Sequence, residues 1–119
     1  MSSFRFKNLE IWQQSRVLVK EVYVMTRTFP AEERYALVDQ LRRAAISVPS
    51  NIAEGSARKS AADFIHFLVI SRGSLAELLT QLIVAQDLGY ISDMTPLEQA
   101  IEAIAVKINA LMASLNSKK

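Results

Sequence analysis

The chain has few of the residues that most catalytic and metal sites require. Cysteine is absent, so disulfide bonds and thiolate metal ligands are excluded. Histidine occurs once, at His66, and its apolar sequence neighbours leave no plausible partners for a Ser–His–carboxylate triad. Only three glycines and three prolines interrupt the 119 residues, and aromatic side chains are few, which is typical of a helical protein.

Long apolar runs and a strong charge bias are also lacking. The first ten residues contain no apolar core of a signal peptide, and no apolar run approaches transmembrane length. We therefore expect a cytoplasmic protein without a membrane partner. The net charge is only +2, and its basic part lies in the first half of the chain. This bias is too mild to demand a nucleic-acid partner.

The spacing of apolar residues predicts the first two helices. One runs from Leu9 to Phe29, with Asn8 as its N-cap, because apolar residues recur there at intervals of three, four and seven. Pro30 opens the second helix, which ends at Gly55 and Ser56. We expect a kink at Pro49, because proline removes one backbone donor and crowds the carbonyl four residues earlier.

Two further helices follow with short links. Ser60 and Asp63 form a capping-box pattern at the start of the third helix, and Gly89 marks its end. Thr95 caps the fourth helix, with Pro96 at its first position. Four long helices joined by short links predict a single all-α domain over residues 1–119, folded as an antiparallel up-down four-helix bundle with a kinked second helix.

Apolar surface exceeds what one bundle core can hide. The first helix carries a second apolar stripe, the third is apolar on nearly every side, and the fourth has an outer face of small apolar residues. Such surfaces need cover, so we expect a homo-oligomer. The stripe on the first helix consists of Trp12, Val19 and Tyr23, and the outer face of the fourth of Ala103, Val106, Ala110 and Ala113.

Basic residues form two candidate sets for contact with phosphates. The set near the second helix consists of Arg42, Arg43, Arg58 and Lys59, with Arg34 before it; the outward set on the first helix consists of Arg16, Lys20 and Arg27. On a helical wheel the second-helix set does not form one stripe. Asp39 precedes Arg43 by four residues and Glu54 precedes Arg58 by four, so local ion pairs remain the alternative to nucleic-acid binding.

No residue pattern supports catalysis or a cofactor. Asp63 and His66 have the spacing with which di-iron bundles bind metal, but such a site needs a second pair and two more carboxylates. Gly55, Lys59 and Ser60 lack the spacing of a phosphate-binding loop. We therefore expect a protein that is not an enzyme and that holds no cofactor or metal.

Four segments carry a resemblance to a known family. They are NLEIW (8–12), the Phe29-Pro30 junction with the acidic residues after it, QLRRAAISVPSNIAEGSAR (40–58) and FIHFLVISRGSLAELLTQL (64–82). Through them nearly the whole chain resembles the four-helix-bundle proteins encoded in intervening sequences of bacterial 23S rRNA genes, and their free-standing relatives.

The resemblance implies an assembly and a set of partners. It implies a homopentamer with a central channel, and kinship with the accessory protein of diversity-generating retroelements, a basic pentamer that binds nucleic acid and associates with a reverse transcriptase. This chain is less basic than those accessory proteins. The hypothesis is a non-enzymatic oligomer that binds RNA or other nucleic acid, with a reverse transcriptase as a candidate protein partner. A protein-interaction scaffold without a nucleic-acid partner is the alternative.

Overall fold

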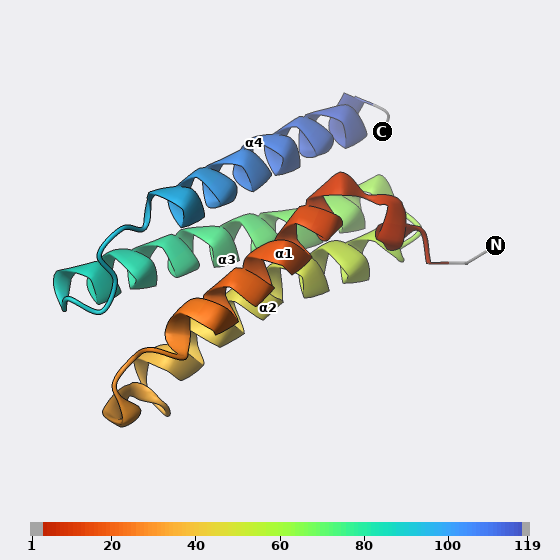
Figure 1. Ribbon diagram of the computed structural model, residues 1–119. Helices are drawn as coiled ribbons and strands as arrows, with labels where there is room; N and C mark the ends of the chain where they lie inside the picture. Colours follow the sequence, from red (N-terminus) through yellow and green to blue (C-terminus); the bar gives the residue numbers. More distant parts are fainter. Residues whose placement is uncertain (1–3, 118–119) are drawn as a thin grey trace.

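Four antiparallel α-helices make up the body of the protein in the computed structural model, which describes residues 4–117 (Figure 1). Each helix packs on the next in chain order, and the last returns to the first. The predicted all-α up-down four-helix bundle is confirmed. The helices are α1 (Glu10–Thr26), α2 (Leu37–Ser56), α3 (Ala61–Asp87) and α4 (Thr95–Ser117), with short 3-10 helices η1 (Arg5–Asn8) and η2 (Ala31–Glu33) before α1 and α2.

The link between α1 and α2 is longer than the sequence predicts. The first helix ends at Thr26 and not at Phe29, and Pro30 opens only the short η2. A turn follows, in which Ala36 has φ −122° and ψ −103°, outside the helical region, so α2 cannot begin before Leu37. The prediction of Asn8 as the N-cap of α1 is also wrong, because Asn8 closes η1.

The ends of α3 follow the predicted signals. The Ser60 hydroxyl accepts a hydrogen bond from the backbone N–H of Asp63 at 3.1 Å, which satisfies a donor that the first turn leaves free. Gly89 stops the helix with φ +83°, a left-handed conformation that suits glycine.

The start of α4 differs by one residue from the prediction. The carbonyl of Met94 accepts the first helical bond, from the N–H of Glu98, so Thr95 lies inside the helix and does not cap it. The Asp93 carboxylate accepts from the N–H of Thr95 at 3.0 Å, and this hydrogen bond holds the pKa of Asp93 below its ordinary value. A local Asx-type turn therefore leads into the helix.

The core is an aliphatic layer between the helices, with α2 and α3 in the closest contact. Leu41, Ile52, Leu68 and Leu78 are among the side chains with no exposed surface, and each such burial stabilises the fold by about 1.5–3 kcal/mol. Along this contact Ser71, also fully buried, donates from its hydroxyl to a backbone carbonyl of α2, that of Val48, at 2.8 Å.

Polar groups also join α2 to α3 beside Pro49. The Ser47 and Ser74 hydroxyls lie 2.8 Å apart, and the Asn51 amide donates to both the hydroxyl and the carbonyl of Ser47. Within this framework α2 runs unbroken from Leu37 to Ser56. The kink predicted at Pro49 stays a prediction.

Part of the apolar surplus is covered within the chain. Trp12 packs edge-on against Phe6 of η1, with ring centroids 5.0 Å apart, and the Arg42 guanidinium covers the ring of Tyr23. The second stripe of α1 is therefore half-buried within one subunit, and its need for a partner stays a prediction.

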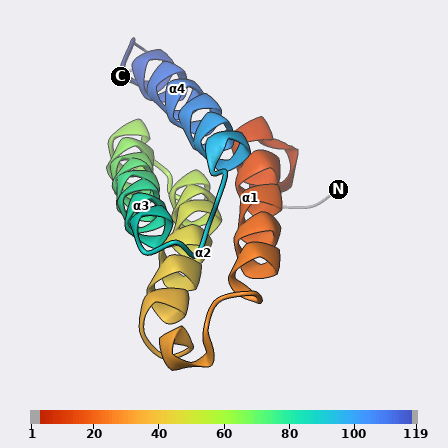
Figure 2. The same cartoon turned by 60° about the vertical axis from the view of Figure 1, so that its left-hand side comes forward.

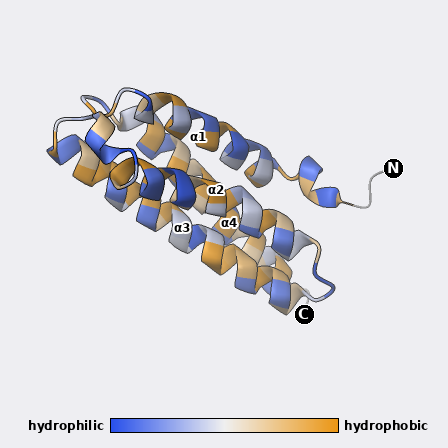
Figure 3. Ribbon diagram, turned by 90° about the horizontal axis from the view of Figure 1, so that it is seen from below, coloured by the Kyte–Doolittle hydropathy of each residue, from blue (hydrophilic) through white to orange (hydrophobic). Residues whose placement is uncertain are grey.

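No other helix of residues 4–117 lies on the outer sides of α3 and α4 (Figure 2), and apolar residues recur along both helices (Figure 3). On α3, Val69, Ile83 and Val84 are exposed by more than 40%, and on α4 Val106 is exposed by 64%. By length and composition α3 could cross a membrane, which corrects the expectation that no run approaches that length. The same composition suits a bundle helix, because its other side fills the core.

Candidate nucleic-acid interface

Cations gather along the outward side of α1. Arg16 and Lys20 are exposed on this helix, and Arg27 follows directly after its last residue. At 100° per residue the three positions lie within about 40° of one another around the helix, and at 1.5 Å per residue they span about 16 Å along it. We call these three residues the α1 stripe. A straight row of charges of this length can follow several phosphates of a strand.

The carboxylates of α1 lie on a different flank of the helix. Glu10 forms an ion pair with Lys107 of α4. Glu21 lines a small hollow between α1 and α4, together with Ala100 and Ala103. Both acids therefore lie on the α4 side of α1. Lys20 shares a hollow there with Glu21, whereas no acid lines the hollows beside Arg16 and Arg27.

Arg42 extends the positive surface from α1 onto α2. Its Nε donates to the hydroxyl of Thr26 at 3.0 Å, and its Nη2 donates to the carbonyl of Tyr23 at 3.4 Å. The guanidinium carbon lies 4.4 Å from the centroid of the Tyr23 ring. These contacts hold Arg42 against α1 in a fixed orientation, while its remaining N–H groups stay free to bind an anion.

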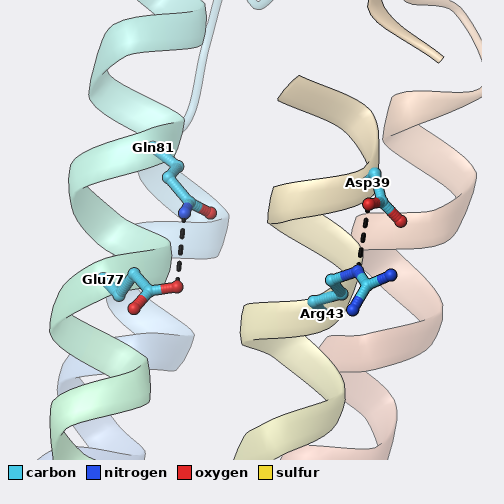
Figure 4. A network of polar contacts seen from close by, with 4 residues as sticks. All are labelled: Asp39, Arg43, Glu77 and Gln81. Atoms are coloured by element: carbon cyan, nitrogen blue, oxygen red, sulfur yellow. Dashed lines mark hydrogen bonds and ion pairs between the residues drawn. The ribbon is translucent and has the colours of Figure 1, made fainter. Parts of the chain in front are cut away.

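Three cations of the second-helix set, Arg43, Arg58 and Lys59, do not join this surface. Arg43, whose side chain is 80% exposed, pairs with Asp39 at 3.0 Å (Figure 4), and Arg58 pairs with Glu54 at 2.6 Å. Both are the local ion pairs that the sequence predicts as the alternative to nucleic-acid binding by these two arginines. Lys59 lies in the link after α2, at the opposite end of this helix from Arg42, and takes part in no ion pair within residues 4–117.

Shallow hollows accompany the α1 stripe. One of about 560 Å³ is lined by Arg16, Lys20 and Tyr23 together with Ile46 of α2. Another, of about 540 Å³, is lined by Arg16 with Lys7, Trp12 and Gln13. The cations thus stand at the rims of concave surface, where a strand can approach them closely.

Three arginines that sequence spacing does not group together line one hollow at the end of the bundle. Arg27, Arg34 and Arg42 line a hollow of about 390 Å³ where α1 passes through η2 into α2. In the sequence Arg34 only precedes the second-helix set, and no local pattern places it beside Arg27 and Arg42. The remaining lining residues are Thr26, Phe29, Pro30, Ala31 and Val38.

Asp63 and His66, whose spacing matches a di-iron motif, do not belong to a cluster of metal-ligating side chains within residues 4–117. His66 is exposed and lies edge-on to the ring of Phe67, with centroids 5.4 Å apart. Within residues 4–117, no group of three or more His, Asp or Glu side chains is placed to hold a metal ion.

Comparison with known families agrees with this architecture. The family model of the 23S rRNA-intervening sequence protein matches residues 7–110. No curated protein matches the chain. The matched range contains α1, α2, α3 and most of α4, and with them the α1 stripe and Arg42. Because the match covers most of the sequence, the chain belongs to the 23S rRNA-intervening sequence protein family.

Proposed function

We propose that the protein is a non-enzymatic, cytoplasmic homo-oligomer that binds RNA or other nucleic acid through the face formed by α1 and α2. The observation that carries this proposal is the α1 stripe, Arg16, Lys20 and Arg27, whose neighbouring carboxylates are turned toward α4. Cations in one row bind the phosphate backbone and read little sequence.

The binding strength expected from one subunit is modest. If the α1 stripe and Arg42 contact four phosphates of a single strand, the logarithm of affinity falls with the logarithm of salt with a slope of about −3. Several copies of the face in one assembly multiply such a weak contact, because the second contact with the same strand is intramolecular.

The uncovered apolar faces support assembly. Ile83 and Val84 on α3 and Val106 on α4 expose 43–64% of their surface, which a second copy would cover. The family resemblance implies five subunits. A ring of subunits would also repeat the α1 stripe at regular intervals.

The binding test uses fluorescence anisotropy with a labelled single-stranded RNA at several salt concentrations. The double variant Arg16→Gln/Lys20→Gln removes two charges of the stripe, so we expect weaker binding and a slope reduced by about 1.4. The control Lys59→Gln/Arg72→Gln removes two charges from the α2–α3 link and α3, breaks no ion pair within residues 4–117, and should leave the slope unchanged. Absence of binding to RNA and DNA at about 50 mM salt, where phosphate contacts are strong, contradicts the proposal.

The assembly test measures mass by light scattering. One chain has a mass of 13.3 kDa, and we expect a multiple of it at micromolar concentration. Ile83→Glu places a charge on the outer face of α3 and should lower the measured mass, whereas Thr80→Glu/Ile83→Glu should lower it further. A wild-type mass of one chain would overturn the oligomer.

A protein-interaction scaffold is the second candidate, because the groove between α1 and α4 is apolar and open. Val17 and Val24 are exposed by 58% and 48% along it, and Ala103 lies opposite them. A partner protein, such as a reverse transcriptase, that stays bound after nuclease treatment favours the scaffold. Loss of that partner after nuclease treatment favours nucleic acid as the bridge.

A further inference from the structure

The hollow at the α1–α2 end of the bundle brings together three guanidinium groups from three separate segments. Arg27 follows α1, Arg34 follows η2, and Arg42 lies in the second turn of α2. The cations share a concave surface of about 390 Å³ with an apolar floor that includes Phe29 and Val38. Like charges that line one hollow repel, so an anion bound in it would be stabilised by the cations that it contacts.

Arg42 is held in place before any ligand arrives. Hydrogen bonds to Thr26 and to the carbonyl of Tyr23 use only part of its donors, and the Tyr23 ring supports the guanidinium plane. The Thr26 hydroxyl is itself fixed, since it donates to the carbonyl of Val22 at 2.8 Å. A guanidinium that is already ordered loses little entropy when it binds an oxyanion.

The nearby carboxylates do not occupy the hollow. No acidic residue lines it. Glu33 accepts from the Tyr90 hydroxyl at 2.8 Å and from the N–H of Leu37, so it faces the α3–α4 link. Asp39 is paired with Arg43. Glu32 is exposed on η2 and remains the nearest acid in sequence without such a contact.

We propose that this hollow binds a terminal phosphomonoester, and that in the cell the phosphate is the end group of a nucleic-acid strand. A monoester carries up to two negative charges and is bonded on one side only, so it can enter between the three arginines more easily than an internal phosphodiester. Tyr35, next to Arg34 and 86% exposed, offers a ring on which the terminal base can stack. The strand as the source rests on the proposed function; the phosphate chemistry does not.

The experiment compares 12-nucleotide RNAs of one sequence with a 5′-phosphate, a 3′-phosphate or no terminal phosphate. We expect the wild-type protein to bind one of the phosphorylated strands about tenfold more tightly than the unphosphorylated strand, as for a few partly solvated charge-assisted hydrogen bonds. Arg34→Gln should remove this preference, because it takes one of the three cations from the hollow. The variant should still fold, because Arg34 is exposed and its guanidinium lies over the ring of the neighbouring Tyr35. Lys59→Gln, an equal charge change at the opposite end of α2 that breaks no ion pair within residues 4–117, should retain it.

A second arm separates the two sources of phosphate. Adenosine monophosphate and inorganic phosphate are added as competitors and, separately, as ligands in thermal unfolding. Equal affinity for the three RNAs, with no stabilisation by either small ligand, overturns the site while leaving the α1 stripe intact. Stabilisation by adenosine monophosphate, lost in Arg34→Gln, without RNA binding retains the phosphate site but overturns the strand as its source and with it the proposed function.

Discussion

Gly55 permits a close approach of α2 to α3, and its replacement by alanine tests the packing of the bundle. A Cβ at this position would lie 2.7 Å from the Cβ of Phe67, 2.9 Å from a ring carbon of Phe64 and 3.3 Å from the carbonyl oxygen of Phe64. Carbon atoms in good contact are about 3.5–4.0 Å apart. Because the Phe67 Cβ is attached directly to the backbone, α3 itself must move to relieve the contact.

Two opposing effects determine how much Gly55→Ala changes the free energy of unfolding. Alanine is favoured over glycine in a helix by about 1 kcal/mol, whereas overpacking costs about 1–3 kcal/mol. A clash with backbone-anchored atoms belongs at the upper end of that range, so Gly55→Ala should destabilise the fold by about 2 kcal/mol and lower Tm by about 8 °C. Gly73 in α3 is the matched control, since no described atom outside its own turn of the helix lies within 4 Å of its added Cβ. Gly73→Ala should stabilise the fold by about 0.5–1 kcal/mol.

The assay is urea unfolding followed by far-ultraviolet circular dichroism, with thermal unfolding in parallel. Both are run at two protein concentrations, because oligomerisation makes stability depend on concentration. The two glycine variants should shift the midpoint in opposite directions. A Gly55→Ala protein as stable as wild type, or a shift of both variants in the same direction, would refute the close contact between α2 and α3.

Two further predictions concern single hydrogen bonds. Ser71→Ala removes the buried bond to the Val48 carbonyl and should cost about 1 kcal/mol of unfolding free energy in urea, while the exposed control Ser50→Ala should cost close to nothing. The bond from Tyr90 to Glu33 raises the pKa of Tyr90, so its contribution is complete below the ordinary value of 10.0 and is lost as pH rises through the raised pKa. The Tm difference between wild type and Tyr90→Phe should therefore shrink between neutral pH and about pH 11; a constant difference would contradict the coupling.

The four helices follow from local patterns. Apolar residues at intervals of three and four specify which side of each helix is buried, and Ser60 and Gly89 specify the ends of α3 through contacts within one turn. Local patterns did not predict the length of the α1–α2 link, because Pro30 favours the start of a helix but does not determine how many residues that helix contains. The local ion pairs of Arg43 and Arg58 were predictable for the same reason as the helices, since both partners lie one turn apart.

The candidate site was only partly predictable. A helical wheel is enough to place Arg16, Lys20 and Arg27 on one side of α1. The association of Arg42 with Tyr23 depends on how α1 and α2 are aligned, which the packing of their buried side chains decides. Sequence spacing gave no sign that Arg34 would share a hollow with the other two arginines.

Near-neighbour chemistry therefore accounts for the bundle, its uncovered apolar faces and the α1 stripe, because helical periodicity and capping act over a few residues. Only the packing of α1 on α2 decided that Arg42 is fixed against Thr26 and that three arginines line one hollow at the end of the molecule. The packing of α1 on α4 decided that Glu10 pairs with Lys107. Those contacts join residues that are distant in the chain, and their geometry arises when the helices pack together.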